Sequence, residues 1–351
     1  MVLKYHFHKS SSINQNQGVK LVIIDRKLPW LTSSRGIFIT VEQRNDKISF
    51  MRITNQNIKP IIYAFLAAVL YALSTPFSKL LLDRLNPTLL AGLLYLGAGI
   101  GMGFVKLIQP KHGHALPFTK KDTIAIVAMI LLDVAAPILL LFGLRLSHPE
   151  SVALLNNFEI VATALFAFFF FKEIISKRLG IAIILVTMAS IVLSFEDLVS
   201  FQISWGALLV LLATLCWGLE NNITRVLSKN DPLQVVIIKG LGAGIGSLLI
   251  AFAIGQMYFD GLLWLYALGL GFVAYGLSIF LYVSAQRHLG AATTSAFYGI
   301  APFVGALLSL IIFRQWPGYN FLIGLILMVI GAYLAFNRQR KNKHLVEKNG
   351  R

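Results

Sequence analysis

The hexapeptide LGAGIG at 96–101 returns unchanged at 241–246, and each copy starts nine residues after a proline, Pro87 or Pro232. Upstream, a shift of 146 instead of 145 residues aligns two polar quartets with the spacing i, i+3, i+4, i+7, which places each quartet on one helix face. The quartets are Tyr71, Ser74, Thr75 and Ser78 in the first copy and Trp217, Glu220, Asn221 and Thr224 in the second. A repeat of this length in so apolar a chain is typical of two-halved membrane transporters rather than of stacked solenoids.

The composition is that of a membrane protein. Hydrophobic residues make up 57% of the 351 residues and charged residues 13%, with a mean hydropathy of +0.74, whereas soluble domains average about 45–50% apolar and about 25% charged residues. The net charge of +16 does not indicate nucleic acid as a partner, because the basic residues lie outside the apolar runs. The single cysteine, Cys216, is expected to pack as a small hydrophobe.

Ten apolar runs are long enough, at roughly 20 residues, to cross a bilayer. We predict an all-α integral membrane protein with spans at 61–82, 88–108, 123–146, 150–171, 179–195, 205–226, 233–254, 261–285, 291–313 and 319–336. The links between the spans are too short to hold a soluble catalytic domain. The expected domains are therefore a first five-helix repeat at 61–195 and a second at 205–336, flanked by basic segments at 1–58 and 337–351.

The placement of Lys and Arg predicts the orientation in the cytoplasmic membrane. With the N-terminus in the cytoplasm, the links after even-numbered spans and the two termini hold 26 of the 31 basic residues, and the opposite side holds four. We expect both termini to be cytoplasmic and, because five is odd, the second repeat to be inverted relative to the first. Residues 1–50, which lack a signal peptide, are expected to be either a disordered tail or an upstream extension from a misplaced start codon.

Ionisable side chains inside lipid cost about 2.5–3.5 kcal/mol each at a helix centre, so each needs an explanation. Asp133 lies ten residues into its span, and Glu159 has Asn156 and Thr163 one turn away on either side. Neither carboxyl has an obvious basic partner at its depth. We expect Asp133, Glu159 and Glu220 to couple protons or to bind a substrate amine, because burial favours the protonated form of a carboxyl group.

Glu220 and Lys239 are predicted to lie at one depth, because each is six residues from the cytoplasmic end of its span. One interpretation is a structural ion pair that lets both charges survive burial. The other is that Glu220 lines the substrate path and Lys239 tunes its protonation. The two interpretations are compatible.

Aromatic and small residues extend these patterns. Tyr275, Ser278 and Tyr282 share a face of the eighth span and Tyr298 lies in the ninth, where such residues either pack or line the substrate path. Three prolines within spans are expected to interrupt the backbone hydrogen bonds and either free carbonyls for ligands or merely kink the helices; they are Pro76, Pro137 and Pro302. Two glycine series are expected to let helices approach closely; they are Gly97, Gly99, Gly101 and Gly103, and Gly240, Gly242, Gly244 and Gly246.

The sequence holds no recognisable catalytic, ATP-binding or metal-binding motif. We therefore predict no enzyme activity, no cofactor and no metal. The expected partners are a small-molecule substrate, the lipid bilayer and protons; a homodimer is compatible with the sequence. The alternatives are an intramembrane enzyme or lipid-handling protein and a membrane sensor that transports nothing.

Three sets of motifs resemble the EamA-type, ten-helix branch of the drug/metabolite transporter superfamily. They are YALSTPFSK at 71–79 with WGLE at 217–220, the prolines that precede the two glycine series, and FKE at 171–173 followed by Gly180 with FRQ at 313–315 followed by Gly324. The resemblance implies two inverted five-helix repeats, a cavity lined by spans one, three, four, six, eight and nine, and export of small metabolites such as amino acids by alternating access. Relatives often carry Glu-Pro where this chain has Glu159 and Ile160, which leaves open whether the fourth span is kinked there.

Overall fold

The computed structural model divides into two units, Met1–Lys59 and Pro60–Arg351. It describes residues 19–25, 37–43, 55–108, 118–172, 175, 177–197, 202–227, 231–289, 298–315 and 318–349. In the first unit, strands β1 (Val19–Asp25) and β2 (Ile37–Gln43) pair antiparallel, with Val22 opposite Thr40. The expectation that residues 1–50 form a tail or an upstream extension stays a prediction.

The described part of the second unit contains ten apolar helical segments. Seven are long and apolar enough to cross a membrane, and three are shorter: Leu179–Ser194, Ala301–Phe313 and Gly318–Leu334. The predicted all-α membrane fold with ten helices is thus confirmed. The start of the ninth predicted span, 291–297, lies outside the described residues, and the last helix continues to Asn349 instead of ending near 336.

The first repeat contains helices α1 to α7. They are α1 (Asn55–Ala72), α2 (Ser74–Leu82), α3 (Pro87–Ile108), the 3₁₀ turn η1 (Lys120–Asp122), α4 (Thr123–Leu146), α5 (Pro149–Leu155), α6 (Phe158–Phe171) and α7 (Lys177–Ser194). The short antiparallel strands β3 (Phe195–Asp197) and β4 (Gln202–Ile203) follow. The second repeat contains α8 (Trp205–Leu227), α9 (Pro232–Ala253), α10 (Gly261–Leu270), the π-helical segment η2 (Gly271–Leu277), α11 (Ser278–Leu289), α13 (Ala301–Phe313) and α14 (Gly318–Asn349).

The two prolines that precede the duplicated hexapeptide each begin a helix. Pro87 is the first residue of α3 and Pro232 the first of α9. Proline suits this position because its missing N–H would have no partner within the helix. Asp231 completes the start of α9 by accepting a hydrogen bond from the backbone N–H of Leu233 at 3.0 Å.

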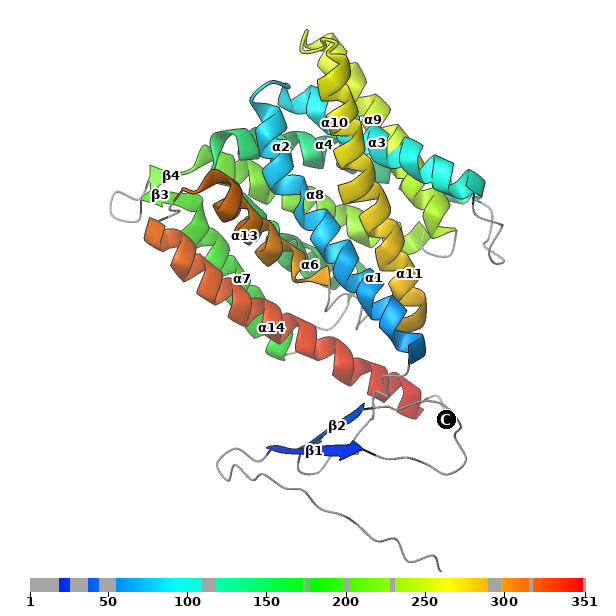
Figure 1. Cartoon of the computed structure of the whole chain (residues 1–351), viewed down its shortest axis with the longest axis vertical. Helices are drawn as coiled ribbons and strands as arrows, with labels where there is room; N and C mark the ends of the chain where they lie inside the picture. Colours follow the sequence, from blue (N-terminus) through cyan, green and yellow to red (C-terminus); the bar gives the residue numbers. More distant parts are fainter. Residues whose placement is uncertain are drawn as a thin grey trace, which may run out of the picture. The chain divides into compact units, whose positions relative to one another are not determined.

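Equivalent helices of the two repeats pack against each other: α3 lies along α9, and α7 along α14 (Figure 1). A Cβ atom on Gly240 would lie 2.6 Å from the backbone N of Gly99, and one on Gly244 would lie 2.6 Å from the backbone N of Leu96. The two backbones therefore touch, as the glycine series predicted. Gly103 is the exception in the two series, because a Cβ atom there would meet nothing within 4 Å.

A further long contact joins the repeats along α4 and α8. At one end a Cβ atom on Gly143 would lie 2.6 Å from the carbonyl O of Gly206, and at the other Met129 and Leu227 share one buried cluster. The pair that corresponds when the two repeats are exchanged, α1–α2 of the first repeat and α10–η2–α11 of the second, packs much less closely among the described residues. The two halves are thus related by duplication but do not have the same packing.

Candidate functional site

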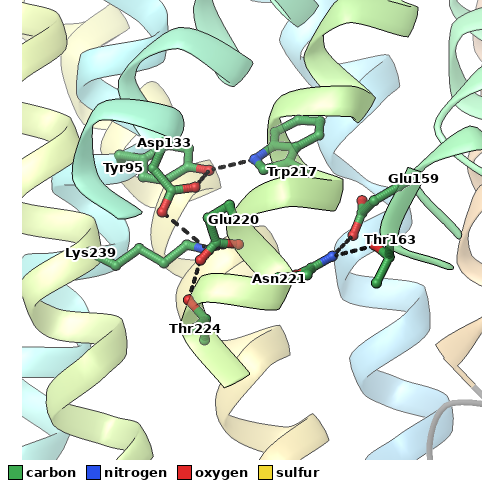
Figure 2. A network of polar contacts seen from close by, with 9 residues as sticks. All are labelled: Tyr95, Asp133, Glu159, Thr163, Trp217, Glu220, Asn221, Thr224 and Lys239. Atoms are coloured by element: carbon green, nitrogen blue, oxygen red, sulfur yellow. Dashed lines mark hydrogen bonds and ion pairs between the residues drawn. The ribbon is translucent and has the colours of Figure 1, made fainter. Parts of the chain in front are cut away.

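The ammonium group of Lys239 lies between two buried carboxylates (Figure 2). Its Nζ is 3.2 Å from Oδ2 of Asp133 on α4 and 3.1 Å from Oε2 of Glu220 on α8. Both carboxylates are almost completely buried, at 0% and 1% exposure, whereas the Lys239 side chain is 18% exposed. We call Asp133, Glu220 and Lys239 the charge triad.

The charge triad confirms one prediction and corrects another. Glu220 and Lys239 form the ion pair that their equal depth indicated. The expectation that Asp133 has no basic partner is wrong, because Lys239 binds it as well. The position of each residue within its span could not reveal this contact, because the contact requires α4 to lie against both α8 and α9.

Tyr95 on α3 extends the charge triad, and the sequence analysis missed it. Its hydroxyl donates to Oδ1 of Asp133 at 3.2 Å and accepts a hydrogen bond from Nε1 of Trp217 at 3.2 Å (Figure 2). At the other end of the charge triad, the hydroxyl of Thr224 donates to Oε1 of Glu220. The sequence did contain a signal for Tyr95, because the two repeats differ at this aligned position. Tyr95 directly precedes the first LGAGIG copy, whereas Gly240 precedes the second.

Glu159 lies on the other side of α8 and contacts a different polar group. The side-chain amide of Asn221 donates to Oε1 of Glu159 at 2.6 Å and to Oγ1 of Thr163 at 3.3 Å. The prediction that Glu220 and Asn221 share one helix face is wrong, because consecutive residues point about 100° apart. Glu220 projects toward α4 and α9 and Asn221 toward α6 (Figure 2). The neighbouring Asn222, which sequence reasoning also missed, donates to the backbone carbonyls of Thr163 and Gly218.

Two spans of the first repeat are broken beside the polar groups. The first span is interrupted at Leu73, between α1 and α2, and the fourth at Asn156 and Asn157, between α5 and α6. Pro76 explains the first break, because it cannot donate to the carbonyl of Ala72. Pro137, by contrast, leaves α4 continuous.

The fourth span is interrupted although this chain lacks the Glu-Pro sequence that relatives often carry there. The break lies two to three residues before Glu159, in the Asn-Asn pair, and Glu159 falls in the first turn of α6. The second repeat has its counterpart at 299–300, directly before α13, one residue beyond the position given by the 142-residue shift between Phe171 and Phe313. The two helices also end alike, because Lys172 and Arg314, the residues that follow them, both have φ of 52°.

A pocket opens where the broken helices meet. The space in it that a water molecule can enter has a volume of about 10 Å³, and its walls come from the break of the first span, from α5 and from the start of α13. Oδ1 of Asn156 is buried and has no hydrogen-bond partner among the described residues. The polar wall residues are Tyr71, Ser74, Thr75 and Asn156, and Pro302 and Gly305 lie opposite.

A chain of tyrosine rings connects the pocket to the charge triad. Tyr71 in the pocket wall packs against Tyr275 with ring centroids 6.0 Å apart, and Tyr275 packs against Tyr95 at 5.6 Å. In the other direction Tyr71 contacts Tyr298 at 5.5 Å, and Tyr298 contacts Tyr282 at 4.9 Å. The π-helical turn η2 carries Tyr275, and such turns often occur at functional sites.

The thirteen predicted site residues therefore form three neighbouring groups. The network around the charge triad contains Asp133, Trp217, Glu220 and Lys239. The contact between α6 and α8 contains Glu159 and Asn221. The pocket and the tyrosine chain contain Tyr71, Ser74, Thr75, Asn156, Tyr275, Tyr282 and Tyr298.

Comparison with known proteins gives consistent matches. The EamA-like transporter family matches the chain twice, over 58–195 and 204–337. An uncharacterized transporter of Methanothermobacter thermautotrophicus is 23% identical over 292 residues, which cover 77% of this chain and 84% of that protein. A crystal structure of another protein, 18% identical, superposes with a TM-score of 0.58 over 79% of this chain and 95% of the other, a likeness that concerns the fold alone.

Proposed function

Because this chain belongs to the EamA-like transporter family, we propose that it exports small amino-acid-like metabolites across the cytoplasmic membrane, coupled to protons. The family is one of membrane transporters and not of enzymes. The observation that carries the choice of substrate is the pocket at the helix breaks, with its buried and unpaired Asn156 carbonyl.

One side of the pocket is suited to an ammonium group. A buried carbonyl oxygen without a donor is costly, and a ligand N–H removes that cost. Asn156 Oδ1 is such an atom, and Glu159 starts the helix that follows the same break. Tyr71, in the pocket wall, is within electrostatic range of the Glu159 carboxylate. Together these groups offer acceptors and negative charge to a substrate cation.

The opposite side of the pocket is suited to a carboxylate. The first turn of α13 lines it through Ala301 and Pro302, and the N-terminus of a helix carries partial positive charge. Ser74 and Thr75 contribute hydroxyl groups from the start of α2. A zwitterion with an amine and a carboxylate a few ångströms apart matches both sides.

Substrate entry requires the helices to move. With about 10 Å³ open to a water molecule, the pocket has room for about one water and not for an amino acid. The walls come from both repeats, so we expect movement of one repeat against the other to enlarge the pocket. This arrangement supports alternating access by two rocking halves.

The test combines binding and transport. In a thermal-shift screen, amino acids are expected to raise the melting temperature of the purified protein, whereas nucleosides and sugars are not, because a bound ligand stabilises by mass action. Asn156→Leu is expected to weaken binding of the stabilising amino acid at least tenfold. Ser247→Ala, which removes a buried and unpaired polar atom outside the pocket, is expected to leave binding unchanged.

The proposal fails if no amino acid stabilises the protein. It also fails if vesicles that contain the protein do not exchange radiolabelled amino acids, supplied as a mixture of the standard set, across their membrane. An equal loss of binding in both variants would assign the effect of Asn156 to packing.

A further inference from the structure

We propose that the charge triad is the proton-coupling site of the transporter, with Lys239 as an internal counter-ion that leaves Asp133 when Asp133 takes up a proton. This inference rests on the proposed proton-coupled transport. It separates the three membrane carboxyl groups by role, since Glu159, which pairs with Asn221 on the other side of α8, then takes no part in the coupling step.

The hydrogen bonds of the charge triad indicate which atom receives the proton. Two of the four carboxylate oxygens accept a hydrogen bond from a hydroxyl group, Oδ1 of Asp133 from Tyr95 and Oε1 of Glu220 from Thr224. Oε2 of Glu220 pairs with Lys239. Oδ2 of Asp133 is buried, and its polar contact within the described structure is the ammonium of Lys239. If Lys239 moves fully to Glu220, this oxygen can only be satisfied by a proton.

The charge balance drives the same exchange. Two carboxylates and one ammonium leave one net negative charge in a site whose acids are almost fully buried, and an uncompensated buried charge is costly. A proton on Oδ2 of Asp133 makes the site neutral and leaves one intact pair, Lys239 with Glu220. The titratable groups at the site in the described structure are Tyr95 from α3, Asp133 from α4, Glu220 from α8, Lys239 from α9 and, packed against Tyr95, Tyr275 from η2. Glu159 of α6 lies on the other side of α8 and does not contact the charge triad.

The charge triad lies where such a change affects the packing of the two repeats. Asp133 belongs to the first repeat, whereas Glu220 and Lys239 belong to the second. The ion pair between Asp133 and Lys239 therefore holds α4 to α9, beside the closely packed contact of α4 with α8. Protonation of Asp133 removes this link and favours an arrangement in which the repeats have moved apart at this joint.

Helix α8 connects this event to the substrate. Glu220 belongs to the charge triad, and the next residue, Asn221, binds Glu159 in the first turn of α6, one turn after the pocket residue Asn156. A rotation of α8 that follows the altered charge triad moves both contacts at once. Coupling between proton and substrate needs no further element.

The first experiment measures transport with Asp133→Asn in vesicles loaded with a radiolabelled mixture of the protein amino acids. Asparagine removes the proton site and leaves Lys239 paired with Glu220, so the variant resembles the protonated state and is expected to fold. We expect exchange without a pH gradient to stay within about threefold of the wild type and accumulation driven by a pH gradient to fall more than tenfold. Glu150→Gln, which neutralises a buried carboxyl outside the charge triad, is expected to retain both activities. Gradient-driven accumulation that survives in Asp133→Asn overturns the inference.

A second experiment needs no substrate, so it separates failure of this inference from failure of the proposed function. Trp217 donates to Tyr95, which donates to Asp133, so the fluorescence of Trp217 reports the protonation of Asp133. In a protein whose other four tryptophans are phenylalanine, we expect this fluorescence to change with pH. The change is expected to disappear in Asp133→Asn and to persist in Glu150→Gln. A signal that does not depend on pH, or that survives in Asp133→Asn, contradicts the assignment, whether or not any amino acid is transported.

Discussion

At the scale of single residues, the protein keeps charge in lipid by sharing one cation between two acids. Lys239 lies 3.2 Å from Asp133 and 3.1 Å from Glu220, so neither acid is isolated in the membrane interior. Either contact alone would leave a buried carboxylate uncompensated, which is more costly than a complete pair. The three side chains must therefore be considered as one unit in any mutational study.

A set of nested variants tests this unit. Lys239→Ala is expected to destabilise the protein by about 3–5 kcal/mol, because it leaves buried acids without a partner. Adding Glu220→Gln is expected to restore part of the loss, and adding Asp133→Asn as well is expected to restore most of the remainder, since the energies of contacting residues are not additive. Melting temperatures and monodispersity by size-exclusion chromatography measure the series. Full recovery in the double variant would show that Asp133 does not depend on Lys239.

At the scale of helices, the glycine series decide how closely α3 and α9 can pack. A Cβ atom on Gly240 would lie 2.6 Å from the backbone of Gly99. The backbone cannot yield as a flexible side chain can, so even alanine forces the two helices apart. This contact joins equivalent helices of the two repeats and therefore affects the whole membrane unit.

Alanine substitutions separate this packing role from helix propensity. Gly240→Ala is expected to cost about 1–3 kcal/mol through overpacking and to lower the melting temperature by several degrees. Gly103→Ala provides the matched control in the same series, because its Cβ atom meets nothing within 4 Å, and it is expected to be neutral or slightly stabilising. Equal effects at both positions would contradict a close contact between α3 and α9.

The helices were predictable from the sequence because runs of about 20 apolar residues are a strong signal. The break at Leu73 follows from Pro76, whereas the break at Asn156 and Asn157 has no proline or glycine to announce it and depends on packing. The site was predictable where polar residues stand out within a span, as Asp133 and Glu220 do. Tyr95 and the contact of Asp133 with Lys239 were not, because hydropathy does not tell which helices are neighbours.

At the scale of the whole molecule, the two repeats share a sequence pattern but differ in packing. The contact of α4 with α8 runs along both helices, while α1–α2 and α10–η2–α11 pack much less closely among the described residues. A transporter with two inverted halves exchanges such closed and loose joints between its two states. Under the alternating access proposed above, this structure corresponds to one end of that cycle.

The orientation of the repeats is tested by reporter fusions. Because 26 basic residues lie on one predicted side and four on the other, fusions after Ser147, Glu196 and Gln315 are expected to report the outside, and fusions after Lys177 and Arg338 the cytoplasm. A reporter at Glu196 that gives a cytoplasmic signal would mean that the second repeat is not inverted.

The pairing of α3 with α9 and of α7 with α14 has a consequence for the origin of the protein. Each pair brings one helix together with its own duplicate, which is the geometry of a two-fold axis between identical subunits. If the repeats are inverted as the charge distribution predicts, the same contacts before the gene was duplicated required two copies of a five-helix chain inserted in opposite directions. The fused chain then became free to diverge, and a tyrosine at 95 against a glycine at 240 is such a difference beside the charge triad.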